Sequence, residues 1–564
     1  MTTPSRMRTR TRHGTSLLMT AALLSTAVTG LALTSGQSGD AATRPAHASP
    51  GRGSPAQARL VDRVPTPVLH WTACRKTDQC ATAELPLDYS HPDGAKIRVA
   101  LLRVRAKDRA HRLGTIFVNP GGPGDSARDW AARLAPALPK AIAGRFDIVG
   151  ADPRGAGGST QIRCFATKAE QTRAEAPFTA TPFPGTQAQQ RSWIAAARAV
   201  GRACSITARS IAPAMSTTED ARDLDVLRRA VGDRKLTYFG ESYGSYLGLV
   251  YANMFPGRVR AIAIDGIVDP QAIAGTRATA HVPMFDRMGS AAASYRALHK
   301  LLELCQQAGR PRCSFAGADT AARYGQLAER LQAHPLHLAA RGFKPVTVAY
   351  PNLIAYTEQW LHIPSGYRGL FADLTGLARL TSPGGGGPGR AALVRAFLRR
   401  HPVVKPPAGY DNQFEAQSGV FCTDGPHAAS AASWPAAAAA ADRHASYFGA
   451  FYAWLTVQCA RNTWTAQDPN VYRGPFDRHT AAPVLVVGGW WDPATSYGNA
   501  VKVARMLPNS RLVSSDNWGH ESAGTSACAD NAIFGYLIHP QAPAPKVTHC
   551  VGRVQPFPPA PSTH

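Results

Sequence analysis

Short apolar runs alternate with amphipathic stretches through the first half of this chain. Between the runs, residues 218–231 place apolar residues at helical spacing, after threonines suited to an N-cap and with acidic residues in the first turn. Strands that alternate with helices predict a parallel sheet with helices packed on its faces. The runs with the length and pattern of β-strands are residues 97–105, 115–119, 146–151, 236–239 and 261–264.

The pattern changes after about residue 270. The following two hundred residues are mostly helical in character, and include an alanine-rich run and a glycine-rich connection. Strand-like runs then return at residues 483–488 and 511–515. We therefore predict an α/β fold in which a large, mainly helical insertion interrupts one sheet. The predicted parts are a first core segment at 61–270, the insertion at 271–475 and the rest of the core at 476–564.

The N-terminal residues are typical of an export signal. Arginines at positions 6, 8, 10 and 12 precede an apolar stretch, residues 16–33, that is short and broken by Ser, Thr and Gly. This pattern predicts a secretory signal peptide at 1–36 rather than a membrane span, with an uncleaved anchor as the minor alternative. Residues 37–60, rich in Pro, Gly, Ser and Ala, are expected to form a flexible lead-in or pro-segment. We expect a secreted protein without stable membrane association.

Cysteine usage agrees with export. The ten cysteines all follow the predicted signal, and in an oxidising compartment an even number predicts disulfides. Pairing in sequence order is the simplest of many connectivities. No CxxC or HExxH pattern occurs, so no metal site is predicted. The cysteines are Cys74, Cys80, Cys164, Cys204, Cys305, Cys313, Cys422, Cys459, Cys528 and Cys550.

The chain is strongly basic, with 62 Lys and Arg against 37 Asp and Glu and a net charge of +25. The arginines are scattered, and no basic run or aromatic–basic repeat appears, so we predict no nucleic-acid partner. No phosphate-binding loop or dinucleotide fingerprint is present, so no cofactor is expected. We expect a monomer.

One short motif carries candidate chemistry. Residues 240–244 read GESYG, a G-x-S-x-G pattern that follows an apolar run and precedes a helical pattern. This strand–turn–helix context is the one that a nucleophile elbow requires, and small flanking residues allow the sharp turn. Ser242 is therefore a candidate nucleophile. Its alternative role is that of a small residue in a tight turn.

A nucleophilic serine needs a base and an acid that orients it. In α/β folds built around such an elbow, the acid and then the histidine follow late strands. Asp492 follows the run at 483–488, and His520 follows the run at 511–515. Asp265 follows a strand that comes too early, and the histidines near the C-terminus lie in a proline-rich tail. Ser242, Asp492 and His520 are thus the predicted triad.

An oxyanion hole needs two backbone N–H donors. Residues 119–124, NPGGPG, follow an early strand, where the second donor is expected. We assign the donors to Gly122 and Tyr243. The alternative for the glycine motif is an ordinary Gly-Pro turn.

These motifs together resemble the secreted tripeptidyl aminopeptidases, α/β-hydrolase serine peptidases related to proline iminopeptidases. The resemblance implies the same triad, a cap formed by the helical insertion, and a supporting role for Thr495 beside the acid. One departure is GWWDPATS around Asp492, where family members more often have smaller residues before the Asp. The motifs that carry the resemblance are PLDYSHPDG (86–94), NPGGPG (119–124), ADPRGAGGS (151–159), YFGESYG (238–244), AIDGIVDP (263–270), FCTD (421–424), VVGGWWDPATSYGNA (486–500), RLVSSDNWGHESAG (511–524) and the pair Cys528 and Cys550.

An aminopeptidase must also hold the free ammonium group of its peptide substrate, which requires a carboxylate in a partly dry pocket. Asp424, in the shared FCTD motif, is the first candidate, and Glu415 and Glu358 are alternatives. Glu241 raises a competing interpretation, because serine carboxypeptidases share a GESY elbow whose Glu grips the substrate's C-terminus. Carboxylesterase activity on the same triad is a third interpretation, and a non-catalytic secreted binding protein is a fourth.

Overall fold

The computed structural model describes residues 55–75, 77–385, 387–402, 408–542 and 548–558. The predicted signal peptide and most of the predicted lead-in lie outside these residues. The described chain forms one ten-stranded sheet, in the order β1-β2-β3-β5-β4-β6-β7-β10-β11-β12, and a separate β8–β9 hairpin. The strands are β1 Thr72–Arg75, β2 Asp78–Pro86, β3 Lys96–Val104, β4 Gly114–Asn119, β5 Phe146–Ala151, β6 Leu236–Glu241, β7 Val259–Asp265, β8 Leu336–Leu338, β9 Val346–Val348, β10 Val484–Trp491, β11 Ser510–Trp518 and β12 Thr548–Cys550.

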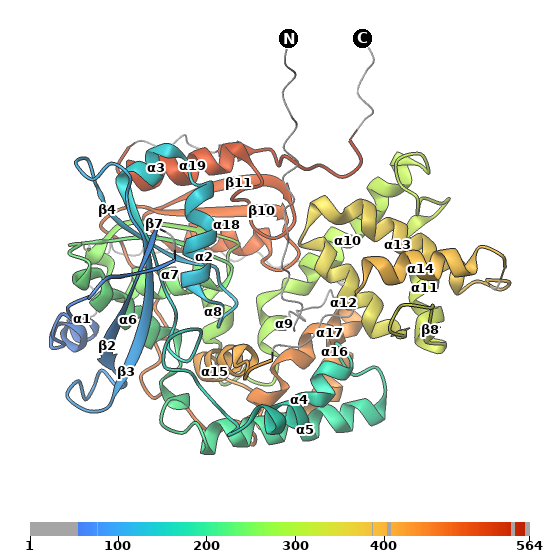
Figure 1. The fold of residues 1–564 in the computed structure, drawn as a ribbon, viewed down its shortest axis with the longest axis horizontal. Helices are drawn as coiled ribbons and strands as arrows, with labels where there is room; N and C mark the ends of the chain where they lie inside the picture. The colour runs from blue at the N-terminus through green and yellow to red at the C-terminus, as the bar shows by residue number, and fades with distance from the viewer. Residues whose placement is uncertain (1–54, 76, 386, 403–407, 543–547, 559–564) are drawn as a thin grey trace, which may run out of the picture.

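Helices cover the sheet and fill the interval between β7 and β10 (Figure 1). The α-helices are α1 Pro55–Asp62, α2 Ala127–Leu134, α3 Lys140–Arg145, α4 Lys168–Ala180, α5 Gln187–Ile206, α6 Thr217–Ala230, α7 Tyr243–Met254, α8 Pro270–Ala274, α9 Met284–Met288, α10 Ser290–Ala308, α11 Thr320–Ala333, α12 Tyr350–Leu361, α13 Tyr367–Leu380, α14 Arg390–Arg400, α15 Gln413–Asp424, α16 Trp434–His444, α17 Gly449–Ala453, α18 Tyr497–Met506 and α19 Ala527–Ile538. The 3₁₀ turns are η1 Ala135–Ala137, η2 Ala212–Ala214, η3 Pro256–Arg258, η4 Pro364–Gly366, η5 Ala431–Ser433 and η6 Trp454–Cys459.

The central strands are buried on both faces. Strands β4 and β6 are buried along their whole length, because α2, α3 and α19 pack on one face of the sheet and α6, α7 and α18 on the other. From β5 to β12 neighbouring strands are parallel, whereas β1, β2 and β3 form an antiparallel edge. Parallel strands that lie between two helical layers read as continuous apolar runs, which is why the sequence revealed them.

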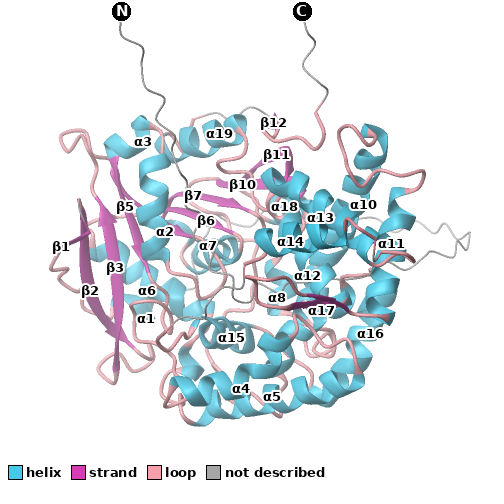
Figure 2. Cartoon of the chain, turned by 45° about the vertical axis from the view of Figure 1, so that its right-hand side comes forward, coloured by secondary structure: helices cyan, strands magenta, loops and turns pink. Residues whose placement is uncertain are grey.

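The helical insertion packs beside the sheet (Figure 2). Helices α4 and α5, which come before β6 in the chain, join this layer: Phe178 packs edge-on against Trp193, and Trp193 packs against Trp454 of η6. The helical layer beside the sheet is therefore built from two separate segments of the chain, one before β6 and one between β7 and β10. No helix in the described part of the chain is long and apolar enough to cross a bilayer.

One part of the predicted lead-in is ordered helix. Residues 55–60 belong to α1. The helix is fixed to the core, because Val61 near its end is fully buried and Arg222 donates two hydrogen bonds to Gln57. Composition alone suggested flexibility there, and tertiary contacts override it.

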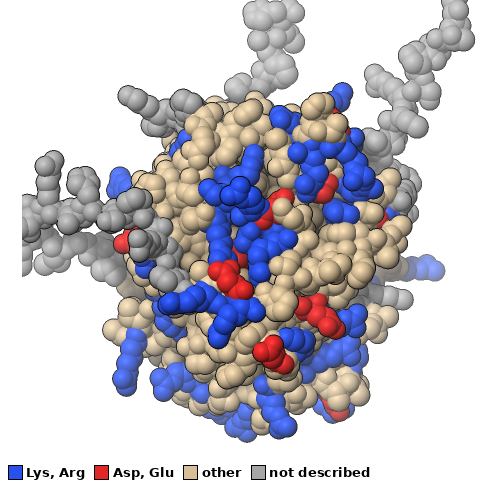
Figure 3. Space-filling view, turned by 90° about the vertical axis from the view of Figure 1, so that its left-hand side faces the viewer, with Lys and Arg blue, Asp and Glu red and all other residues tan. Residues whose placement is uncertain are grey.

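Sequential disulfide pairing is confirmed. The five bonds are Cys74–Cys80, Cys164–Cys204, Cys305–Cys313, Cys422–Cys459 and Cys528–Cys550. Lys and Arg dominate the charged surface on the side of the molecule seen in Figure 3, in keeping with the net charge of +25.

Candidate active site

Ser242 occupies a strained turn between β6 and α7. Its φ of 55° and ψ of −124° place a non-glycine residue in a rarely populated backbone region, and its N–H donates to Asp265 O at 2.9 Å. Glycine at 244 is required by space, since a Cβ there would lie 2.6 Å from Asn119 O. Such strain is characteristic of functional turns. The Ser242 side chain is partly exposed at the end of the parallel sheet.

His520 and Asp492 form a close pair at the ends of neighbouring strands. The Asp492 Oδ2 lies 2.9 Å and Oδ1 3.0 Å from His520 Nδ1. Burial lowers the pKa of His520, but the Asp492 carboxylate outweighs this, and the net pKa is raised above 6.5. This is the pairing that fixes the ring orientation of a general base and leaves its Nε2 for the nucleophile.

Asp492 is fully buried and is held by its own loop. The backbone N–H groups of Ala494 and Thr495 each donate to Oδ1 at 2.8 Å, and Thr495 Oγ1 donates to Oδ2 at 2.8 Å. Burial raises the pKa of Asp492, but the charge of His520 and these hydrogen bonds outweigh it, so the pKa lies below 3.8. The carboxylate therefore stays ionised at neutral pH. Thr495, to which the family resemblance assigns a supporting role, thus contacts the Asp492 carboxylate.

Gly266, just after β7, connects the elbow with the histidine loop. Its carbonyl accepts a hydrogen bond from Ser245 Oγ in the first turn of α7. A Cβ at Gly266, whose φ is +64°, would lie 3.1 Å from His520 Cε1. The structure thus brings together the loops that carry Ser242, Asp492 and His520, which lie far apart in the sequence.

The NPGGPG loop packs directly against the elbow. A Cβ at Gly121, which has a φ of +100°, would lie 2.8 Å from Ser242 Cβ and 2.9 Å from Tyr243 N. The Gly121 N–H donates to Asn119 Oδ1, whereas the N–H groups of Gly122 and Tyr243 have no acceptor in the described part of the chain. Tyr243 directly follows Ser242, and Gly122 directly follows the contacting Gly121, so both free N–H groups lie in segments that meet at the elbow, as an oxyanion hole requires.

Sequence reasoning missed Glu521. This residue has a φ of 71°, and its Oε1 lies 3.5 Å from His520 Nε2, the ring nitrogen not used by Asp492. Burial raises its pKa well above 4.5, and the neighbouring Glu241 carboxyl raises it further. A residue beside a predicted catalytic histidine could have been singled out, but nothing in the sequence shows that its side chain turns back to the ring.

Glu241 lies under the elbow rather than in open space. Its side chain is buried, and its Oε2 has no hydrogen-bond partner in the described part of the chain. Burial raises the pKa of Glu241 well above 4.5, and Asp265 adds to the shift. Glu241 and Glu521 are therefore two carboxyl groups that favour the protonated form near His520.

Asp424 at the end of α15 is buried and fully engaged. Its Oδ1 accepts from Thr217 N at 2.8 Å, and its Oδ2 accepts from Thr217 Oγ1 at 2.6 Å. Thr217 Oγ1 in turn hydrogen-bonds the Tyr243 hydroxyl. Burial raises the pKa of Asp424 to about 7. The residue thus lies behind the candidate oxyanion donor, connected to it through Thr217.

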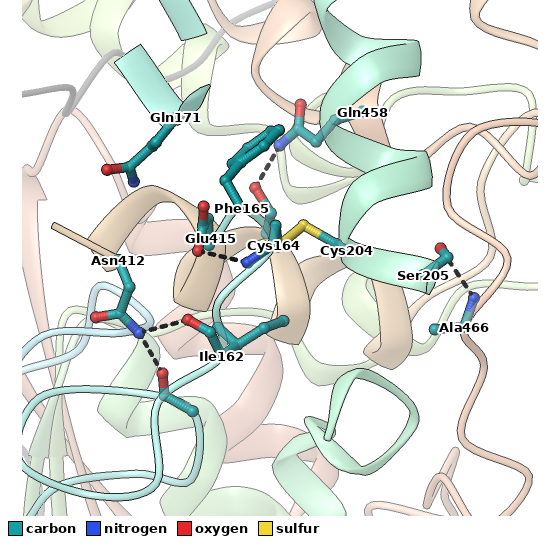
Figure 4. The surroundings of a disulfide bond; sticks show 12 residues. Ile162, Cys164, Phe165, Gln171, Cys204, Ser205, Asn412, Glu415, Gln458 and Ala466 are labelled. Atoms are coloured by element: carbon teal, nitrogen blue, oxygen red, sulfur yellow. Dashed lines mark hydrogen bonds between the residues drawn. A yellow bond between two sulfur atoms is a disulfide. The ribbon is translucent and has the colours of Figure 1, made fainter. Parts of the chain in front are cut away.

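Glu415 at the start of α15 supports a disulfide loop (Figure 4). Its Oε2 accepts from the Cys164 backbone N–H at 3.1 Å, and its Oε1 accepts from the Tyr410 hydroxyl at 2.5 Å. The side chain is fully buried, and burial raises its pKa to about 7. Both oxygens bind this chain's own groups, beside the Cys164–Cys204 bond.

Glu358 on α12 lies next to the histidine loop. Its Oε1 accepts from the Tyr452 hydroxyl at 2.6 Å and lies 3.2 Å from His362 Nδ1. The His362 ring centroid is 5.3 Å from that of His520, and His362 O accepts from His520 N at 3.2 Å. Burial raises the pKa of Glu358 well above 4.5, and the Asp492 charge adds to this. Among the predicted ammonium-site candidates on the insertion, Glu358 is the one whose contacts lead directly to His520.

Comparison with known proteins identifies two matching family models. Residues 114–301 match the model described as alpha/beta hydrolase fold, and residues 445–550 match the model described as TAP-like protein. The tripeptidyl aminopeptidase of Streptomyces lividans is 30% identical over 497 residues, which cover 86% of this chain and 85% of the relative.

Two mycobacterial relatives are similarly related. Serine protease Hip1 of Mycobacterium tuberculosis is 29% identical over 500 residues, covering 83% of this chain and 88% of the relative. Carboxylesterase B of the same species is 30% identical over 511 residues, covering 87% of this chain and 90% of the relative.

Proposed function

The chain belongs to the tripeptidyl aminopeptidase family of α/β-hydrolase serine peptidases, and we propose that it is a secreted exopeptidase that releases tripeptides from free N-termini. The observation that carries the proposal is the His520–Asp492 pair, which adjoins the strained Ser242 elbow in a chain of this family. In this proposal Ser242 is the nucleophile, His520 the general base and Asp492 the orienting acid.

The proposed reaction proceeds through an acyl-enzyme. Ser242 Oγ attacks the scissile carbonyl carbon while His520 Nε2 takes the hydroxyl proton, and a tetrahedral oxyanion forms. His520 then gives this proton to the leaving amine as the C–N bond breaks. Water attacks the ester with His520 again as base, which releases the tripeptide carboxylate and restores Ser242.

The N–H groups of Gly122 and Tyr243 stabilise the oxyanion in this scheme. Both are free to donate, and backbone donors aligned before the reaction lose little free energy through reorganisation. Thr495 acts as a positioning residue, because it fixes the Asp492 carboxylate that orients His520.

Two features support a substrate with a positive charge. Carboxyl groups lie close together around the triad, notably Glu241, Asp265 and Glu521, and burial and mutual repulsion raise their pKa values. A substrate ammonium group would supply the positive charge that favours their ionised forms. Glu358 reaches the site through His362, and we assign the substrate ammonium to Glu358 in preference to Asp424, since both Asp424 oxygens are occupied by Thr217.

The helical insertion supplies α12 and is assigned the role of a cap. It would limit access to the triad, so that only a chain end can enter, and it would set the number of residues removed. Residues 61–270 and 476–564 form the catalytic core in this division. The N-terminal signal and the five disulfides support secretion of the mature protein.

The test uses Ala-Ala-Pro-p-nitroanilide with a free or an acetylated N-terminus, and three isosteric variants. Glu358→Gln is expected to raise KM for the free-amine substrate about tenfold. Burial favours protonated Glu358 in the free enzyme, but a bound ammonium group would lower its pKa and ionise it, and the neutral amide cannot form that charge-assisted hydrogen bond. Glu415→Gln, at a carboxyl placed away from substrate, is the matched control. Asp424→Asn tests the other candidate for the ammonium site. A larger rise in KM in Asp424→Asn than in Glu358→Gln would assign the ammonium group to Asp424. Hydrolysis that is indifferent to acetylation in the wild type would overturn the aminopeptidase assignment.

A carboxylesterase is the second candidate function, because a relative of that name is as similar as the aminopeptidase. The same triad would cleave short acyl esters. Faster turnover of p-nitrophenyl butyrate than of any free-amine peptide would favour this candidate.

A further inference from the structure

A cavity of about 520 Å³ lies where the insertion meets the chain that leaves the core after β7. We call it the basic cavity. Its walls come from residues 274–280 at the end of α8 and just after it, residues 425–427 after α15, residues 459–467 at and after η6, and Arg473. Its size falls in the range of small-molecule sites. Ser242, Asp492 and His520 are not among the residues that line it.

All the charged residues that line the basic cavity are positive, apart from the titratable His427. Arg277, Arg461 and Arg473 line the cavity, and none of its lining residues, all in the described part of the chain, is Asp or Glu. The side chains of Arg277 and Arg461 are exposed, and no described residue pairs with their guanidinium groups. Unpaired guanidinium groups around a hollow favour an oxyanion, which they bind through paired N–H donors.

The cavity wall is held in place by the fold. Arg473 Nη1 donates to Ala274 O at 3.1 Å and to Asp424 O at 2.9 Å. The Cys422–Cys459 disulfide ties the end of α15 to η6, and Arg461 N donates to Ala428 O at 3.0 Å. Arg461 and Arg473 therefore project from a preformed wall rather than from a free loop.

The titratable groups packed behind the cavity wall do not neutralise the positive charge of its arginines. Arg287 donates to backbone carbonyls on both sides. Burial and the neighbouring Arg473 charge lower its pKa to about 10, and the Asp286 charge offsets this only in part. His427 is neutral, because burial and the neighbouring arginines lower its pKa to about 3. The carboxyl groups are weak counter-charges: burial raises the pKa of Asp424 to about 7 and that of Asp286 well above 3.8.

We propose that the basic cavity is a binding site, separate from the candidate triad, for a small ligand that carries a carboxylate or phosphate group. Arg461 and Arg277 bind the oxyanion from the open side, and Arg473 completes the positive wall. Pro426 and Ala280, which are partly exposed, contact the rest of the ligand.

The test measures binding by calorimetry to the full chain carrying Ser242→Ala, so that nothing is hydrolysed. The probes are inorganic phosphate, N-acetyl-Ala-Ala-Pro with a free carboxylate, and the same peptide as its amide. Arg277→Gln with Arg461→Gln removes two charges that no described residue pairs with, and breaks no side-chain hydrogen bond in the described part of the chain. Arg395→Gln with Arg399→Gln, at two exposed positions on α14, removes the same charge elsewhere as the control.

The proposal predicts saturable binding of phosphate or of the peptide carboxylate, weakened about tenfold or more by the cavity variant, as loss of charge-assisted hydrogen bonds requires. The α14 control should bind as the parent does, and the amide should bind far more weakly than the carboxylate. Which probe binds identifies the source of the oxyanion. No saturable binding of either anion, or binding that the cavity variant leaves unchanged, would overturn the proposal. Because the acetylated peptide lacks an ammonium group and Ser242 is absent, this result is independent of the proposed peptidase activity.

Discussion

The carboxyl group of Glu521 lies 3.5 Å from Nε2 of His520, the ring nitrogen that accepts the Ser242 proton in the proposed reaction. Asp492 occupies the opposite nitrogen at 2.9 Å. The histidine is therefore flanked by two carboxyl groups with opposite pKa shifts, since that of Asp492 is lowered and that of Glu521 is raised. Only Asp492 is ionised throughout the neutral range, so the two carboxyl groups have different roles.

Glu521→Gln tests the role of the second carboxyl group. Because burial and Glu241 raise the pKa of Glu521, the protonated acid and the amide are close mimics. We expect kcat/KM near neutral pH to stay within about threefold of wild type, a change of less than 1 kcal/mol. The wild-type pH–rate profile should contain an ionisation above the usual range of Glu that the variant lacks. Superimposable profiles would show that this carboxyl group does not influence the reaction.

The acid limb of the pH–rate profile reports His520. Catalysis needs the neutral ring, and the pKa of His520 is raised above 6.5, so activity should fall as the pH drops through a value above 6.5. Asp492→Asn removes the raising charge and leaves burial, which shifts the limb to lower pH. It should also lower kcat by about 10⁴-fold, because the ring is no longer held in the right tautomer. If the acid limb stays at the same pH in Asp492→Asn, the Asp492 charge does not set the pKa of the group that controls activity.

Thr495→Val removes the hydroxyl that donates to Asp492 Oδ2 at 2.8 Å while keeping the shape of the side chain. We expect kcat to fall about tenfold with little change in KM, since a buried hydrogen bond to a charged group is worth about 1.5–3 kcal/mol. Thr179→Val, at an exposed threonine on α4, is the control. A change in KM alone would mean that Thr495 contacts substrate instead of positioning the acid.

The raised pKa of Glu415 should make the free energy of unfolding depend on pH, without a matching effect on activity. Its folded pKa of about 7 exceeds the ordinary 4.5, so the folded state favours the protonated form. This contribution to stability is fully present below pH 4.5 and is lost as the pH rises through 7. Denaturant unfolding between pH 4.5 and 7 should show a loss of up to about 3 kcal/mol in the wild type that Glu415→Gln lacks. Equal slopes in the two proteins would contradict the raised pKa.

Much of the fold, and the placing of the three candidate triad residues at strand ends, could be predicted from the sequence, because local patterns specify them. Buried parallel strands read as apolar runs, and the order of Ser242, Asp492 and His520 along the chain follows from their strand ends. The glycines of the elbow and of the NPGGPG loop were informative because close approach of backbone leaves no room for a Cβ.

The remaining features depend on tertiary packing. Nothing in the sequence places His362 beside His520, or Glu358 in contact with His362. Helix α12 reaches the site only when the insertion folds back on the sheet. The basic cavity is likewise formed by segments almost two hundred residues apart. The exposed arginines that line it could not be distinguished by sequence from the many others in a chain of net charge +25.

The most direct measurement is the product pattern from a plain hexapeptide, Ala-Ala-Pro-Ala-Phe-Ala, followed by mass spectrometry with the wild type and with Ser242→Ala. The proposed function predicts Ala-Ala-Pro and Ala-Phe-Ala as first products, no cleavage after N-terminal acetylation, and no products from Ser242→Ala. Release of single residues from the C-terminus, or equal cleavage of the acetylated peptide, would contradict it.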